Sequence, residues 1–149
     1  MSTHNFTPQK LTRYSFLWSL ARLAIAAVAL FIGGMPPALA FNPVPALYGV
    51  IGNLLTLAWI ISGAASAYLI YQWHANGQKV FGRKEPLDMV AFLVMVVSGF
   101  NLGLAGLLGT NIGMAISSNQ FVFYVVGLLY LVCGVHLFRR WKAKGERLF

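Results

Sequence analysis

Few side chains of this 149-residue chain could catalyse a reaction. Its three acidic residues, Glu85, Asp88 and Glu146, all fall at the edges of apolar runs. Catalysis by paired carboxylates needs two acids at one site, and a proton- or ion-coupled pump usually needs carboxylates inside the membrane. This placement argues against both mechanisms, and we expect that the chain is not an enzyme.

Two histidines form one suggestive pair. His74 and His136 each lie near the end of an apolar run, and the two runs would cross a membrane in the same direction. Rings at similar depth could ligate haem b, and Arg139, Arg140 and Lys142 could then meet its propionates. The alternative is that each ring lies in the headgroup layer, and we expect no cofactor.

The single cysteine, Cys133, lies inside an apolar run. One cysteine cannot form an internal disulfide, and no cysteine pair exists for a zinc or redox motif. We therefore expect no metal site, and we expect Cys133 to pack as a small apolar residue.

The composition is that of a membrane protein. Hydrophobic residues make up 58% of the chain and charged residues only 9%, with a mean hydropathy of +0.71. Soluble domains carry roughly 25% charged residues, and a membrane helix needs about 20 apolar residues. The sequence predicts an all-α membrane protein, a four-helix bundle over residues 14–138, with spans at about 14–34, 46–71, 87–112 and 121–138.

The first apolar run has two interpretations. As a retained helix it contains Arg22, which we expect to snorkel toward the cytoplasmic interface. As a signal peptide it has a basic start, an apolar core at Leu23–Ile32 and an A-x-A cleavage site at Ala38–Ala40. Removal of residues 1–40 would leave three helices.

The basic residues predict the orientation. They lie in the tail 1–13, in the polar joint Gln72–Asp88 and in the basic interfacial tail 139–149, which we expect to continue the fourth helix along the headgroups. The positive-inside rule then places both termini in the cytoplasm, in the plasma (inner) membrane. The net charge of +8 indicates anionic lipid headgroups as the partner, not nucleic acid. The candidate headgroup contacts are Lys79, Arg83, Lys84, Arg139, Arg140, Lys142 and Lys144.

Small residues predict a close helix pair. Gly99, Gly103 and Gly106 fall on one face of the third run, at spacings that let another helix approach. The second run offers a matching surface of small residues: Ser62, Gly63, Ser66 and Ala67. We expect these two helices to form the tight central pair. The alternative is that small residues are simply common in membrane helices.

Two asparagines, Asn53 and Asn101, lie within the predicted spans. An amide inside a membrane needs a hydrogen-bond partner, and a neighbouring helix usually supplies it. We expect both to join helices in this way, and the alternative is that they line a polar pathway.

The chain contains a repeat at an offset of 68 residues. Aligning Leu69–Phe81 with Leu137–Phe149 gives identities at Leu69/Leu137, Trp73/Trp141, Ala75/Ala143, Gly77/Gly145 and Phe81/Phe149. Extended backward, this offset lays the second run over the fourth and the first roughly over the third. It predicts two parallel helix hairpins related by an axis along the membrane normal. The alternative is convergence of two stretches at the same interface.

These observations favour a non-enzymatic assembly or accessory subunit that packs through glycine-rich faces and forms a homo-oligomer or joins a membrane complex. The alternatives are a small channel, a transporter-like or holin-like oligomer, and a haem b electron-transfer subunit. A leader ending in A-x-A, then two apolar helices joined by a basic turn, also resembles the layout of conjugative-pilin precursors over residues 1 to about 110. That resemblance implies an exported polymer subunit, and the fourth run departs from it.

Overall fold

The computed structural model describes residues 7–33 and 45–149, and its fold is a bundle of helices. The long helices are α1 (Pro8–Phe31), α3 (Tyr48–Ala75), α4 (Pro86–Leu108) and α6 (Gln120–Ala143). A short 3₁₀ helix, η2 (Pro45–Leu47), precedes α3, and a short helix, α5 (Ile112–Ile116), lies between α4 and α6. All four long helices have the length and apolar composition to cross a membrane. The predicted all-helical membrane fold is confirmed.

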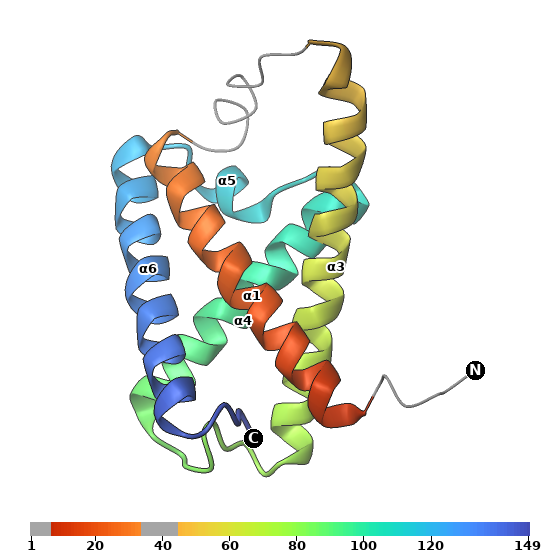
Figure 1. The fold of residues 1–149 in the computed structure, drawn as a ribbon. Coiled ribbons are helices and arrows are strands. Elements are labelled where there is room, and N and C mark those ends of the chain that lie inside the picture. Colours follow the sequence, from red (N-terminus) through yellow and green to blue (C-terminus); the bar gives the residue numbers. More distant parts are fainter. Residues whose placement is uncertain (1–6, 34–44) are drawn as a thin grey trace, which may run out of the picture.

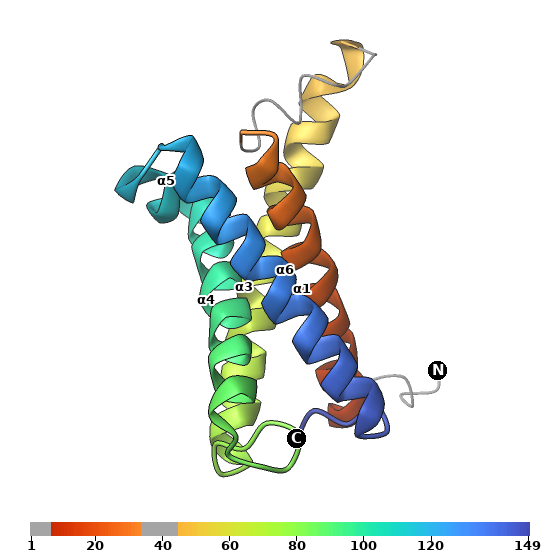
Figure 2. The same cartoon turned by 90° about the vertical axis from the view of Figure 1, so that its left-hand side faces the viewer.

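The four helices cross at an angle, as Figure 1 shows, with α1 in front of α4 and with α3 and α6 on opposite sides. In Figure 2, α1 lies beside α6 and α4 lies beside α3, and these two pairs make the most extensive contacts. The start of α1, the loop 76–85 and the C-terminus all lie at one end of the bundle. We call this the charged end, because all three acidic residues lie there, and α5 lies at the opposite end.

The first helix begins earlier than predicted. Thr7 is its N-cap, and the Thr7 hydroxyl accepts a hydrogen bond from the Lys10 amide at 3.4 Å. Pro8 follows in the first turn, where a missing amide hydrogen costs nothing. Residues 8–13, which the sequence assigns to a tail before the first span, are therefore helical and belong to α1.

The connector between α4 and α6 is not an irregular loop throughout. Helix α4 ends at Leu108 because Gly109 adopts a left-handed backbone, with φ of +70°. The Asn111 side chain then caps a new turn by accepting from the Met114 amide. The third span therefore ends before the predicted residue 112, and the connector that follows it contains α5.

Both helices of the first hairpin, α1 and α3, lie within the described residues. Helix α1 belongs to the packed core, since Phe16 and Leu23 are fully buried. The predicted cleavage site at 38–40 lies outside the described residues, so cleavage stays a prediction.

The predicted tight pair of α3 and α4 is present. A Cβ added at Gly63 would lie 2.7 Å from the Gly103 Cα, so the two backbones touch at this point. Gly99 lies against Ser66 and the Ser62 carbonyl, and Gly106 lies against Thr56, Trp59 and Ile60. Ala67 is exposed, which corrects its assignment to the contact face.

The repeated sequence has a repeated structure at the ends of α3 and α6. Gly77 and Gly145 have φ of +71° and +66°, and the residues after them, Gln78 and Glu146, have +60° and +63°. The Gln78 amide donates to the Trp73 carbonyl at 2.9 Å, and the Glu146 amide donates to the Trp141 carbonyl at 2.9 Å. The two helices therefore end in the same way, 68 residues apart.

Helices α1 and α4 also correspond, but at an offset of 76, which Phe16 and Phe92 define. Each buried residue of α1 has a buried counterpart in α4 at this offset. The aromatic contacts are reciprocal, because Phe16 contacts Trp141 and Phe81, while Phe92 contacts Trp73 and Phe149. The two hairpins are thus related by an approximate two-fold axis. The predicted offset of 68 for this pair is corrected, because the first connector is longer by eight residues (76 − 68).

The C-terminal tail also differs from the prediction. Helix α6 continues past residue 138 as predicted, but it ends at Ala143 and does not reach the end of the tail, since Gly145 and Glu146 reverse the chain. Leu148 is buried, and its carbonyl accepts a hydrogen bond from the Phe81 amide at 2.6 Å. The tail therefore packs onto the loop 76–85 and closes the charged end.

Glu146 makes this closure sensitive to pH. A hydrogen bond from Lys142, together with Arg13 at 2.7 Å, holds the pKa of Glu146 below its ordinary value of 4.5. Since the folded-state pKa is lowered, the ion pairs stabilise the tail at neutral pH and are lost as pH falls through that lowered pKa. We expect Glu146→Gln to speed amide exchange of residues 144–149 by roughly two- to fivefold at pH 7. The difference from wild type should vanish in acid, and equal exchange at pH 7 would contradict it.

Candidate functional site

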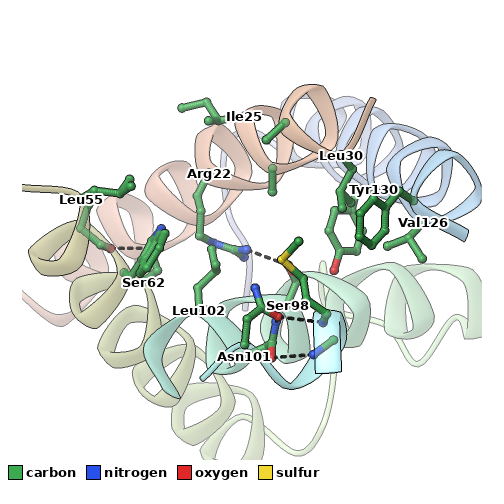
Figure 3. Close-up of a pocket in the computed structure, with 18 of the residues that line it drawn as sticks. Arg22, Ile25, Leu30, Leu55, Ser62, Ser98, Asn101, Leu102, Val126 and Tyr130 are labelled. Atoms are coloured by element: carbon green, nitrogen blue, oxygen red, sulfur yellow. Dashed lines mark hydrogen bonds between the residues drawn. The ribbon is translucent and has the colours of Figure 1, made fainter. Parts of the chain in front are cut away.

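A cavity of about 280 Å³ lies between the four long helices, extending toward the end opposite the charged end. Figure 3 shows its walls, with α1 above and α4 below in that view. Apolar side chains form most of the lining, including Ile25, Leu30, Leu55, Leu102 and Val126. The polar groups of the lining come from all four long helices and from the connector that contains α5, and they are Arg22, Trp18, Ser62, Ser98, Asn101, Asn111, Ser117 and Tyr130.

Arg22 points from α1 across the bundle toward α4 (Figure 3) and is only 8% exposed. Its Nη1 donates to the Ser98 hydroxyl at 2.9 Å, and its Nη2 donates to the Met95 carbonyl at 2.7 Å. Its buried Nε–H has no hydrogen-bond partner among the described residues. The prediction that Arg22 snorkels to the interface is wrong, because its position on α1 faces the core.

Arg22 also lacks an acidic partner in the described structure, and the reason is that all three acids of the chain are engaged at the charged end. Asp88 and Glu85 pair with Arg140, at 2.7 and 2.6 Å. Glu146 pairs with Arg13. The guanidinium of Arg22 is therefore a buried cation whose hydrogen-bond acceptors in the described structure are all neutral.

The approximate symmetry makes Arg22 and Ser98 equivalent positions, 76 residues apart, that hydrogen-bond to one another. The neighbouring contacts are also equivalent but differ in size: Leu23 lies against Gly134 on one side, while Gly99 lies against Ser66 on the other. Leu23 fills space between α1 and α6, whereas at the equivalent position Gly99 lets α3 and α4 approach closely. The two halves thus share a backbone plan, whereas the cation belongs to the first hairpin alone.

The wall at the far end is held by Asn101. Its Nδ2 donates to the Asn111 Oδ1 at 2.9 Å, and its Oδ1 accepts from the Gly113 amide at 3.2 Å. These bonds fasten the α5 connector against the cavity. Asn101 thus joins α4 to the short helix α5 rather than to another long helix, and Asn53 is exposed near the start of α3.

A second wall links α1 to α3. The Trp18 indole donates to the Ser62 hydroxyl at 3.0 Å, and that hydroxyl donates to the Ala58 carbonyl at 2.7 Å. Trp59 lines the cavity from the same helix as Ser62. Two of the four tryptophans, Trp18 and Trp59, thus line the cavity.

The charged end contains a separate cluster around Asp88, whose side chain is fully buried. Arg140 donates to both of its carboxylate oxygens, and the His136 Nε2 lies 2.7 Å from its Oδ1. The prediction that Arg140 contacts lipid headgroups is therefore corrected, because Asp88 and Glu85 occupy its guanidinium. The remaining predicted headgroup residues are exposed or partly exposed: Lys79, Arg83, Lys84, Arg139, Lys142 and Lys144.

The histidine pair is not part of the cavity lining. His74 is exposed at the end of α3, and His136 is engaged with Asp88. No group of three or more His, Cys, Asp or Glu side chains suited to a metal occurs in the described part of the chain. Cys133 is buried among apolar residues, as expected. The haem hypothesis stays a prediction from sequence.

Sequence reasoning found Arg22 and Asn101 but missed Trp18, Ser98 and Tyr130 as their neighbours. The offset of 76 residues between Phe16 and Phe92 is the signal that could have predicted the contact between Arg22 and Ser98, because it aligns these two residues. Comparison with protein-family models, with curated proteins and with solved structures finds no match to this chain.

Proposed function

We propose that this chain is a non-enzymatic accessory protein of the membrane that holds a small, mainly apolar ligand in its central cavity. The observation that carries the proposal is the cavity itself, a preformed space of about 280 Å³ with an apolar lining and a few converging polar groups. Ligand sites of proteins have this character. The polar groups that face it are hydroxyls, amides and a guanidinium, which are suited to binding.

Assembly through the glycine faces, the other part of the predicted role, needs a different surface. Gly63, Gly99 and Gly103 already lie in the contact between α3 and α4 of one chain, so they are not free to contact a partner. A partner or a second copy would meet the outward faces of the helices, which expose many large apolar side chains. In a membrane such faces contact lipid or another protein. We place the charged end in the cytoplasm, on the positive-inside rule.

A transporter-like role is the second candidate, and the approximate two-fold axis favours it. Many secondary transporters are built from repeated helix units and bind substrate near the midplane, at the interface of the repeats. Here the cavity is lined by both hairpins, with Arg22 of the first beside Ser98 of the second.

Filling the cavity should weaken ligand binding. Ala26 lines it from α1, so Ala26→Leu places a larger side chain in the space. We expect this change to weaken binding of 4-butylbenzamide and of 4-butylbenzoate by roughly tenfold or more, the cost of overpacking by several carbon atoms. Calorimetric titration of the protein in phosphatidylcholine nanodiscs measures both affinities, and Trp18 and Trp59 give a fluorescence signal.

The matched control is Ala24→Leu, the same substitution on the exposed face of the same helix. It should leave both affinities unchanged. Equal behaviour of the two variants, or failure of wild type to bind either compound, would refute a ligand role for the cavity. Uptake of labelled 4-butylbenzoate by proteoliposomes tests the transporter-like alternative, and uptake unaffected by Ala26→Leu would count against it.

A further inference from the structure

We propose that the ligand of the central cavity is a small organic anion, whose carboxylate binds the guanidinium of Arg22 and whose apolar body fills the remaining space. This inference rests on the proposed function, because it assigns the chemical class of ligand to the same cavity. It makes Arg22 a binding residue rather than only a structural link between α1 and α4.

The first argument is charge. An ionised group buried without an opposite charge is unfavourable, and proteins normally pair such a group. The chain has only three carboxylate side chains, and all of them bind other cations at the charged end. An anion that completes the site must therefore come from outside the chain.

The second argument is the unused hydrogen-bonding capacity of Arg22. A guanidinium carries five N–H donors, and two bonds are made here, to the Ser98 hydroxyl and the Met95 carbonyl. The Nε–H is buried and unpartnered among the residues that the structure describes. A carboxylate accepts from two adjacent guanidinium nitrogens at once, which is the strongest pairing that arginine makes.

The third argument is size and lining. An apolar protein cavity of roughly 150 Å³ encloses benzene, so a cavity of about 280 Å³ holds roughly a dozen non-hydrogen atoms. Figure 3 shows apolar side chains on both sides of Arg22, among them Ile25, Leu55 and Val126. The ligand is therefore a compact acid with an aromatic or short aliphatic body, and a two-chain phospholipid is too large.

The test compares a carboxylate with a neutral compound of the same shape. In phosphatidylcholine nanodiscs, we expect Arg22→Met to weaken 4-butylbenzoate binding by roughly ten- to a hundredfold, the range of charge-assisted hydrogen bonds. The same variant should change 4-butylbenzamide binding by less than roughly threefold. Arg13→Met, which removes an arginine of the same helix at the charged end, should change neither. Arg22→Lys keeps the charge and should retain most of the preference for the carboxylate.

The outcomes separate this inference from the proposed function. If Ala26→Leu weakens binding of both compounds while Arg22→Met weakens both equally or neither, the cavity binds ligands but the anion assignment is overturned. If neither compound binds wild type, the proposed function itself fails. If phosphatidylglycerol in the nanodiscs removes the effect of Arg22→Met, a lipid headgroup occupies Arg22, and a free organic acid is refuted as its ligand. Should Arg22→Met fail to fold, the affinities of wild type and Arg22→Lys for 4-butylbenzoate and 4-butylbenzamide are compared instead. A preference of both proteins for the carboxylate supports the anion assignment, and equal affinities for the two compounds overturn it.

Discussion

Replacing Gly63 by alanine should destabilise the bundle by about 3 kcal/mol, at the upper end of overpacking costs. The new Cβ would lie 2.7 Å from the Gly103 Cα. A flexible side chain could turn away from this contact, but a backbone atom cannot, so α3 and α4 must separate along their length. Reversible unfolding in mixed micelles measures the change in the free energy of unfolding.

Gly52→Ala is the matched control, because it makes the same substitution in the same helix. A Cβ at Gly52 meets no atom within 4 Å. Alanine is a better helix former than glycine, so the control should be neutral or slightly stabilising. If Gly63→Ala unfolds like Gly52→Ala, the two helices do not touch at these glycines.

Removing the carboxylate of Asp88 should lower the melting temperature by roughly 6–12 °C. Asp88 is fully buried and receives hydrogen bonds from Arg140, with the His136 ring beside it. Asp88→Asn keeps the shape but leaves the Arg140 guanidinium without its buried partner, and loss of one partner of such a pair is strongly destabilising. Thermal unfolding followed by tryptophan fluorescence measures the shift.

Two further variants test the origin of this effect. Glu85 also binds Arg140, but its side chain is 48% exposed, so Glu85→Gln should shift the melting temperature by less than roughly 2 °C. Asp88→Asn combined with Arg140→Gln should be less destabilised than the sum of the single changes, because the two groups form one unit. Additive effects would show that the cluster is not a coupled pair.

The amino-acid sequence by itself determined the class, the number of long apolar helices and their closest pairing. Long apolar runs, basic flanks and glycines spaced by four and three residues are local patterns, and each has a physical consequence that needs no tertiary information. The repeat around Trp73 and Trp141 likewise predicted that the second and fourth runs correspond, and α3 and α6 end alike because the glycine of each copy takes the same left-handed backbone.

The tertiary structure alone decided which polar groups meet. Arg22 and Ser98 are 76 residues apart, and they contact one another only because an approximate two-fold axis brings the buried faces of α1 and α4 together. Arg140 was assigned to lipid because its sequence neighbours are basic, whereas the fold places the buried carboxylate of Asp88 beside it. The fate of a charge near a membrane depends on whether its helix face points to lipid or to the core. For Arg22 that choice was made by packing between hairpins, which no local pattern encodes.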